Sequence, residues 1–306
     1  MLMLAASLCL PLGAVVAEDI NHPDQVLKID YPYTVNGTET WQGVSILSTG
    51  SLTVPKGFTL QAGYIKINGG SIDVNGGSII LSNTVDGNDV YIGGGPNRQG
   101  TASYFNLTDG AKIVLKAPNG NNLLETSQGC DASINIDVKY SVTIKSATIE
   151  CYGGIGFTNP VPWVDHASLF GYYAAGGNGS VRIGSKTTVS TTVSDLNVKL
   201  GGGSAGSAAN GNPPTGFLGG NGGGYSNAGT VGDHVGAGGM GTLSFGGRDL
   251  SVSGLEVYAT SGKGGKAGDA GSRDSDFGSV VGGGGGGGYG GGNGGDYTTG
   301  GTRQGE

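Results

Sequence analysis

The chain has 306 residues, which is enough for one large domain or two ordinary ones. It contains 67 glycines and only 13% charged residues, without the strict glycine triplet of collagen or the high charge of most disordered chains. Its 16 lysines and arginines do not cluster and its net charge is −7, so the sequence predicts no nucleic-acid partner.

The first segment predicts secretion. Residues 1–17, MLMLAASLCLPLGAVVA, carry no charged side chain and end in the small residues that precede a signal-peptide cleavage site. Pro11 and Gly13 interrupt this run, which is also shorter than the ~20 apolar residues of a transmembrane helix. We expect cleavage after Ala17, a protein that is secreted to the extracellular space or the cell surface, and no transmembrane segment in this chain.

Residues 18–152 predict an N-terminal β-domain of short strands. Apolar and polar side chains alternate with a period of two, and β-branched residues dominate. No stretch of ten or more residues carries a convincing helical stripe, so we expect an all-β fold. The alternating stretches are 44–47, 51–54, 64–67, 112–115, 133–138 and 142–145.

A short repeat in residues 65–82 indicates how these strands are arranged. IKINGGS is followed by IDVNGGS and then by IILS, so strand-length pieces are separated by Asn-Gly-Gly. Asparagine and glycine tolerate positive φ, and we expect both to form a corner after each strand. Three corners give a coil of about 21 residues, which favours a parallel β-solenoid over the alternative of an isolated antiparallel meander. The side chains predicted to face inward are Ile65, Ile67, Ile72, Val74, Ile79 and Leu81.

Residues 153–306 predict a glycine-rich continuation of the solenoid. Of the 67 glycines, 41 lie after residue 200, yet the strand-like stretches 179–183, 195–200, 242–245 and 250–257 persist. Tyr225 and Tyr289 recur at equivalent places in two glycine tracts, and we expect them to anchor packing on further coils or on other copies. A larger repeat stops at Glu306 where its next strand is expected, which suggests the N-terminal part of a longer protein.

Two phrases resemble those of a known class of protein. FNLTDGAKIVLKA (105–117) and GGGGGGGYGGGNGGD (282–296) are similar to glycine-rich, adhesin-like, secreted parallel β-helix surface proteins of the pectin-lyase-like β-solenoid type. The resemblance covers most of the mature chain and is one of overall composition and pattern. It implies a right-handed parallel β-helix on a cell surface or filament, and it supplies no catalytic residue.

Two cysteines remain after the predicted cleavage. Cys130 and Cys151 are 21 residues apart, which equals the expected coil length. Residues stacked one coil apart lie ~4.8 Å from each other, inside the Cα separation that a disulfide allows. Because secretion favours oxidation, we predict a structural disulfide, with two unrelated buried thiols as the alternative.

The sequence predicts neither a metal site nor a cofactor. Residues 291–298 approach the calcium-binding nonapeptide, but Thr298 replaces the required large apolar residue and the motif occurs once. His22, His166 and His234 lack the paired spacing of zinc ligands.

One loop is a candidate glycan contact. Aromatic side chains beside an Asp-His pair could stack on a sugar ring and bind its hydroxyls; the alternative is that these aromatics fill the core at the junction of the two halves. The residues are Trp163, Asp165, His166, Tyr172 and Tyr173.

Other polar positions are weaker candidates. The threonine-rich run 187–192 forms either a ligand-facing or ice-facing ladder or a solvated strand face. Asn36, Asn106 and Asn178 match the N-glycosylation sequon and are possible surface sites in a secreted protein.

These observations favour a non-enzymatic protein. A β-helix enzyme that hydrolyses acidic polysaccharides would carry Asn-Thr-Asp, Asp-Asp, Gly-His-Gly and Arg-Ile-Lys, and none of these occurs, although carboxylates could still converge from distant coils. We predict a structural or adhesive protein whose glycine-rich half mediates packing or self-association, with other copies or the glycans of the extracellular matrix or cell surface as partners. The alternative is a carbohydrate-binding or polysaccharide-degrading β-helix protein.

Overall fold

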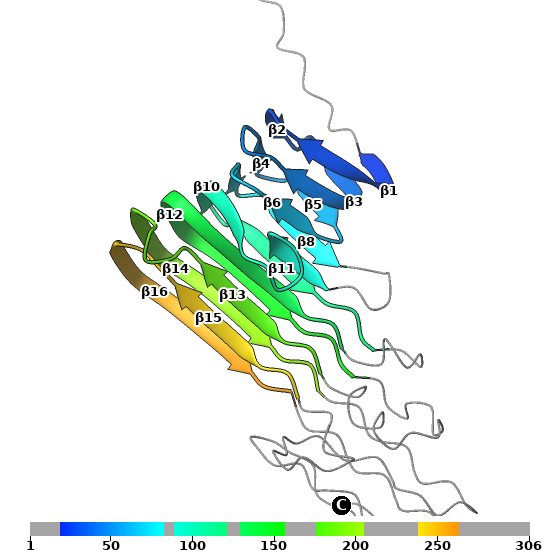
Figure 1. Ribbon diagram of the computed structural model, residues 1–306, viewed down its shortest axis with the longest axis vertical. Helices are drawn as coiled ribbons and strands as arrows, with labels where there is room; N and C mark the ends of the chain where they lie inside the picture. The colour runs from blue at the N-terminus through cyan, green and yellow to red at the C-terminus, as the bar shows by residue number, and fades with distance from the viewer. Residues whose placement is uncertain (1–18, 83–88, 121–128, 157–175, 205–237, 263–306) are drawn as a thin grey trace, which may run out of the picture.

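The computed structural model describes residues 19–82, 89–120, 129–156, 176–204 and 238–262, and within these ranges every regular element is a β-strand (Figure 1). The all-β prediction is therefore confirmed for the described residues. The strands are β1 Ile20–Ile29, β2 Pro32–Thr34, β3 Thr38–Ile46, β4 Ser51–Pro55, β5 Thr59–Ala62, β6 Ile65–Ile67, β7 Ser71–Asn75, β8 Ser78–Ser82, β9 Val90–Gly93, β10 Gly100–Thr108, β11 Lys112–Lys116, β12 Ala132–Tyr152, β13 Gly179–Ile183, β14 Ser190–Gly201, β15 Gly241–Phe245 and β16 Asp249–Thr260.

All pairings between these strands are parallel and fall into three ladders. The first ladder runs through β1, β3, β6, β9, β12, β13 and β15. The second runs through β2, β4, β7, β10, β12, β14 and β16, and the third through β3, β5, β8, β11 and then other parts of β12, β14 and β16. The chain visits the ladders in turn and adds one layer to each with every circuit (Figure 1).

The three ladders share one apolar core. Because side chains alternate along a strand, one set of each strand faces the other two ladders and the other set faces outward. The repeat in residues 65–82 places one strand in each ladder, namely β6, β7 and β8. Parallel pairing and inward orientation are both confirmed here, since the predicted inward residues are all 0–1% exposed: Ile65, Ile67, Ile72, Val74, Ile79 and Leu81.

The Asn-Gly-Gly spacers form corners, as predicted, but through glycine alone. Gly69 and Gly76, the first glycine of each spacer, have positive φ (96° and 69°), whereas the asparagines before them do not. The second glycine is required for space, because a Cβ on Gly70 would come 2.5 Å from the carbonyl oxygen of Gly50. The expectation that asparagine also takes the left-handed conformation is therefore wrong at these corners.

The turn from the third ladder back to the first varies in length from circuit to circuit, and it varies more than the other two corners do. Ile46 pairs with Ile67, as a circuit of about 21 residues requires, but Val181 pairs with Leu243. The additional residues lie after β8, β11, β12 and β14, where the chain leaves the third ladder. The constant coil length expected from the repeat is therefore wrong beyond β8.

The ladders continue across position 152/153, where the sequence suggested that the glycine-rich half begins. β12 crosses all three ladders as one strand and pairs with β10 and β11 on one side and with β13 and β14 on the other. The inward set remains apolar through Val193, Val198 and Leu200, which are 0–1% exposed.

Candidate functional site

The corner between the third and first ladders is the feature that distinguishes this chain from a plain stack of strands. We call it the glycine corner and define it as the outgoing segments 117–120, 153–156, 202–204 and 261–262 with the incoming segments 129–131, 176–178 and 238–240. These segments belong to no strand. Their backbone hydrogen bonds show how they are held.

Outgoing and incoming segments alternate along one series of backbone hydrogen bonds. Each N–H in the series donates to the carbonyl of the previous segment, at N···O distances of 2.8 to 3.1 Å. These six N–H groups thereby find partners without forming a β-ladder. The bonds are Cys130 to Pro118, Gly154 to Cys130, Gly177 to Gly154, Gly203 to Gly177, Gly239 to Gly203 and Gly262 to Gly239.

The hydrogen bonds of these segments have a three-residue period, which is the period of a threefold extended helix. Ala117 and Gly120 donate to Tyr152 and Ile155, so positions three apart bond to the same neighbouring segment. Gly153 and Gly156 donate to Gly201 and Ser204 in the same way. Three residues per turn is the periodicity of the polyproline-II type of helix, which has no internal hydrogen bonds and can direct its peptide groups to several neighbours.

Glycine is required at these positions because the backbones lie too close for a side chain. A Cβ on Gly129, Gly154, Gly177 or Gly203 would overlap a carbonyl oxygen of the adjacent segment, from Gly154, Pro118, Cys130 and Gly154 respectively. The same close approach makes only glycine acceptable on the axis of the collagen triple helix. The glycine corner is therefore a bundle of main chains packed directly on one another.

A column of Asp and Asn side chains fixes where each circuit re-enters the first ladder. Asp89 Oδ1 accepts the N–H of Asp131 (2.9 Å), Asp131 Oδ1 accepts the N–H of Asn178 (2.6 Å), and Asn178 Oδ1 accepts the N–H of Met240 (2.9 Å). The Asn178 amide also donates to Asp131 Oδ1 (3.1 Å). Partial burial raises the pKa of the Asp89 carboxyl, the hydrogen bond from Asp131 N–H opposes that rise, and the nearby Asp131 carboxylate adds to it.

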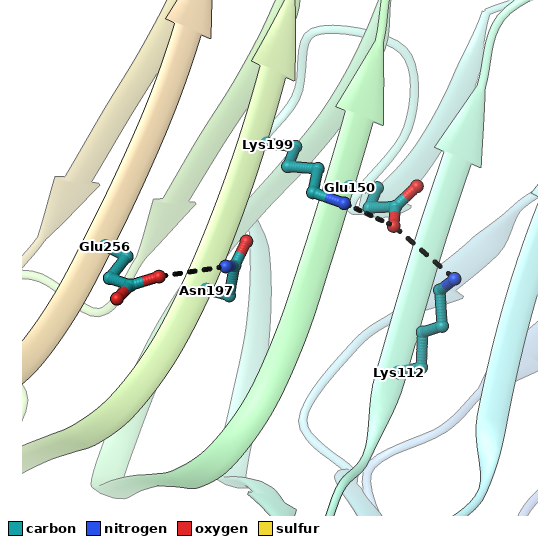
Figure 2. Close-up of polar contacts among 5 residues, drawn as sticks. All are labelled: Lys112, Glu150, Asn197, Lys199 and Glu256. Atoms are coloured by element: carbon teal, nitrogen blue, oxygen red, sulfur yellow. Dashed lines mark hydrogen bonds and ion pairs between the residues drawn. The ribbon is translucent and has the colours of Figure 1, made fainter.

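The outer face of the third ladder is charged. Lys112 and Lys199 lie 3.4 and 3.6 Å from Glu150 Oε1, and Asn197 donates to Glu256 at 3.2 Å (Figure 2). Both lysine side chains are 46% exposed, so each ion pair stabilises the fold by no more than about 1 kcal/mol. The two lysines on this face therefore remain in contact with solvent.

Two further clusters were not found from the sequence. Glu39 is 1% exposed and accepts hydrogen bonds from Tyr33 Oη (2.7 Å), Asn36 N–H (3.0 Å) and Trp41 Nε1 (3.2 Å). Burial and this carboxylate together raise the pKa of Tyr33. A buried carboxylate with three donors fixes a corner of the first layers, and no spacing in the sequence signals it.

The second cluster is an exposed aromatic stack. Tyr104 and Tyr140 stack at 5.3 Å between ring centroids, and Lys139 Nζ lies 4.8 Å from the Tyr140 centroid. Both tyrosines are more than 40% exposed. One face of each ring is covered by the other ring, and the lysine adds a cation–π contact to Tyr140.

Several predicted residues fall outside the described ranges. The candidate glycan-contact loop with Trp163, Asp165, His166, Tyr172 and Tyr173 is one of them. The packing residues Tyr225 and Tyr289 and the calcium-like motif at 291–298 are the others.

The threonine run does not form one outward ladder. Thr188 and Thr191 are buried; Thr188 Oγ1 accepts the N–H of Ser185 (2.9 Å), and Thr191 donates to the Gly246 carbonyl (2.7 Å). Thr192, in contrast, is exposed on β14. The interpretation as a continuous ligand-facing or ice-facing ladder is therefore wrong for this run.

The three sequon asparagines lie in different environments. Asn36 precedes a corner glycine of positive φ, and Asn106 lies in the middle of β10 between Asp73 and Thr143. Asn178 is exposed, but both groups of its amide are engaged in the Asp and Asn column. Modification of Asn178 would therefore disturb the re-entry of two circuits.

The two cysteines are thiols in this structure and are not stacked. Cys151 pairs with Leu115 and Leu200 in the third ladder, whereas Cys130 lies in an incoming segment of the glycine corner. The argument that placed one directly above the other is wrong, because the circuits here are longer than 21 residues. Cys151 Sγ donates to the carbonyl of Ala132 (3.2 Å).

Metal ligands do not gather in the described ranges: no group of three or more His, Cys, Asp or Glu there could hold an ion. Among the same residues, no helix is long and apolar enough to cross a membrane.

Comparison with protein families, curated proteins and solved structures finds no match to this chain.

Proposed function

We propose that this protein is a secreted, non-enzymatic structural or adhesive protein built as a right-handed parallel β-helix. Three parallel ladders around one apolar core support the helix, because each return to the first ladder is a parallel crossover. Such crossovers are right-handed in ~98% of cases. Secretion rests on the apolar N-terminal segment with its small-residue cleavage site.

One observation carries the proposal: the chain's long insertions all leave the body at the glycine corner. The ranges between described segments grow from 83–88 and 121–128 to 157–175 and 205–237 along the chain. A solenoid tolerates such growth because each layer contacts only its neighbours. A rigid body whose insertions all begin and end at one corner suits repeated, weak contacts with a surface, whose combined avidity exceeds that of any single contact.

The chemistry of the glycine corner supports packing more than catalysis. Its glycines offer backbone groups only, and those groups are already used between segments. We infer that the corner is the ordered base from which the insertions extend, and that their partners are other copies or extracellular glycans.

The test combines binding and turnover. The chain from Glu18 is assayed for retention on extracellular-matrix glycans and on cell surfaces, and for release of reducing sugar from a panel of polysaccharides. A variant in which residues 205–237 are replaced by a short Gly-Ser linker should lose at least about tenfold in retention. The matched control is Thr192→Lys, an exposed change on β14 away from the glycine corner, and it should retain binding.

Turnover would contradict the proposal. If any polysaccharide is cleaved and Asp165→Asn or His166→Ala abolishes the cleavage, the enzymatic alternative holds. If neither binding nor turnover is seen, and the linker variant behaves as the wild type does, an adhesive role for the insertions is wrong.

A further inference from the structure

Positive charge is concentrated on one side of the three ladders. Seven of the twelve lysines and arginines in the described ranges lie there, although they are scattered along the sequence. Three of them point outward from the first ladder, namely Lys28, Lys66 and Arg182. Four lie at the corner where the chain passes from the first ladder to the second, namely Arg98, Lys139, Lys186 and Arg248. We call these seven residues together the basic face.

The three cations of the first ladder stand in one column. The parallel register places Lys28, Lys66 and Arg182 at the same outward position of different layers. Parallel strands are ~4.8 Å apart, so Lys66 lies about 10 Å from Lys28 and about 14 Å from Arg182 along the stack. The positions between them hold short, uncharged residues: Ser45, Gly93 and Asn135.

The four cations of the corner extend along the same direction. Arg98 lies between β9 and β10, Lys139 lies in β12, Lys186 lies between β13 and β14, and Arg248 lies between β15 and β16. Each of the last four circuits thus contributes one cation to the corner. Column and corner lie side by side, because the corner is where the strands of the first ladder end.

The charges of the basic face are available to a ligand. All seven side chains belong to exposed residues, and none forms an ion pair with a described residue. The acidic residues on this side are Asp30 and Asp137, and one carboxylate oxygen of Asp137 is buried; Asp249 adjoins it at the start of β16. On the third ladder, in contrast, lysines are paired with Glu150.

The density of these charges indicates what kind of partner fits. A surface of one sign attracts ligands of the opposite sign, even on a chain whose net charge is −7. Seven cations over seven layers amount to one charge per ~5 Å of the stack, whereas duplex DNA carries one phosphate per ~1.7 Å. The basic face therefore suits a polymer whose anionic groups are separated by whole sugar units better than it suits a nucleic acid.

A pair of tyrosines lies within the basic face and adds apolar contact area. Tyr104 and Tyr140 are 44% and 41% exposed and belong to the circuits that supply Arg98 and Lys139. Lys139 also contacts the Tyr140 ring. Tyrosine combines an apolar ring with a hydroxyl group, which suits the C–H groups and hydroxyls of a sugar.

We propose that the basic face binds a linear polysaccharide that carries carboxylate or sulfate groups, with the polymer running along the stack of layers. The column and corner cations pair with its anionic groups, and Tyr104 and Tyr140 contact a sugar ring between them. This inference rests on the proposed function, because it names the class of extracellular glycan and the surface that binds it. The insertions leave at the glycine corner, where the first ladder begins, whereas the corner cations lie where it ends.

Three polymers with one backbone separate the contribution of charge from that of sugar. Dextran is neutral, carboxymethyl dextran carries carboxylates and dextran sulfate carries sulfates. The chain from Glu18 should bind one or both charged polymers at least about tenfold more tightly than dextran. Its dissociation constant should rise with salt, because salt screens the charges and binding releases counterions. The comparison of the two charged polymers identifies the anion, and equal binding to all three contradicts the inference.

Charge reversal locates the site. Lys66→Glu combined with Arg182→Glu should raise the dissociation constant for the preferred polymer at least about tenfold and make its salt dependence less steep. Lys56→Glu combined with Lys145→Glu changes the net charge equally, at the corner between the second and third ladders, and should leave binding nearly unchanged. All four positions are exposed, so both chains should keep the far-ultraviolet circular dichroism of the wild type.

The tyrosine pair gives a second readout. Tyr140→Ala should weaken binding about threefold but leave the salt dependence as it is in the wild type, because the ring contributes contact area and no charge. A change in salt dependence without loss of affinity would show that the ring does not contact the sugar.

The outcomes separate this inference from the proposed function. Equal loss of binding in the two charge-reversed chains overturns the inference, because net charge alone would then explain it. Tighter binding to duplex DNA than to dextran sulfate at the same ionic strength also overturns it and assigns the face to nucleic acid. If replacement of residues 205–237 abolishes retention on glycans and charge reversal of the column does not, adhesion by the insertions stands and the basic face is wrong. The reverse result keeps the basic face and removes the role of the insertions.

Discussion

At the scale of single residues, Cys151 shows how burial in the core changes the protonation of a thiol. Its side chain is completely buried between the third ladder and the start of β12, and its thiol donates to the carbonyl of Ala132. Burial raises the pKa of Cys151 to about 12, because the thiolate would lose its hydration. The group therefore behaves as a small apolar side chain, despite the oxidising compartment that the sequence predicts.

Cys151 should resist alkylation in the native protein. At pH 8 it has about a thousandfold less thiolate than an ordinary cysteine, and the reagent must also reach a buried atom. Incubation with iodoacetamide followed by mass spectrometry should show Cys151 unmodified in native buffer and fully modified in guanidinium. Rapid labelling in native buffer would show that the third ladder opens at β12.

Asp89 occupies the first position of the Asp and Asn column. Replacing it tests how the charge of its carboxylate affects the stability of the fold. Asp89→Asn retains an oxygen to accept the Asp131 N–H and removes a partly buried charge beside Asp131. The variant should be more stable at pH 7 by about 0.5 kcal/mol, a small value because the group is partly exposed.

The pH dependence gives the sign of this effect. The folded pKa of Asp89 is raised, so the folded state binds its proton more tightly than the unfolded state does. The stability of the wild type relative to Asp89→Asn should therefore be greatest below the ordinary aspartate pKa and should fall as the pH rises through the raised value. Thermal melts from pH 3 to pH 8 measure it, and a difference that widens on acidification would contradict the assignment.

At the scale of elements, the glycine corner depends on the absence of side chains. Gly177 has no positive φ, so its requirement comes from space alone: a Cβ would overlap the Cys130 carbonyl oxygen, which is backbone and cannot turn away. Gly177→Ala should destabilise the fold by more than about 3 kcal/mol, because adjacent segments must separate and lose their hydrogen bonds.

Gly57 provides the matched control for this substitution. It has a φ of 86° and nothing within 4 Å of a Cβ, so Gly57→Ala carries only backbone strain. We expect a cost of about 1 kcal/mol there. Denaturant titrations of the two variants give the comparison, and similar midpoints would show that the segments of the corner are not closely packed.

At the scale of the whole molecule, stability should be distributed along the stack. Each layer contacts the layers before and after it, so the fold is close to a one-dimensional array. A chain that ends at Ser204 lacks β15 and β16 but retains β1 to β14. The circular dichroism of this shorter chain should still be that of a β-protein, because the earlier layers remain folded. Its thermal midpoint should be only a few degrees below that of the full chain.

A change inside the stack should be more damaging than this loss of its end. Phe105 is a large side chain, 0% exposed, in β10 at the middle of the ladders. Phe105→Ala in the full chain should cost about 3–5 kcal/mol because it leaves a cavity between layers. If the chain that ends at Ser204 is unfolded while Phe105→Ala is mild, the layers do not act as neighbours in an array.

The sequence by itself determined the strands, their inward faces and the corners of the first circuits. Alternation between apolar and polar residues is a local property, and it places Ile65, Ile72 and Ile79 inward whatever the rest of the chain does. The repeat with its Asn-Gly-Gly spacers also indicated parallel stacking, since equal pieces stack most simply on their own copies. Glycine at the corners followed from the need for positive φ at Gly69 and Gly76.

Only the tertiary structure decided the register between layers, the neighbours of the corner glycines and the surroundings of Cys151. Register between layers depends on segments far apart in the sequence, so the pairing of Val181 with Leu243 could not be obtained from a local repeat. The contacts of Gly177 with segments on both sides are likewise long-range, because its need for glycine arises from the Cys130 carbonyl and from no feature of its own neighbours. Local periodicity fixes which side of a strand is buried, whereas the partner that buries it is set by packing of the whole chain.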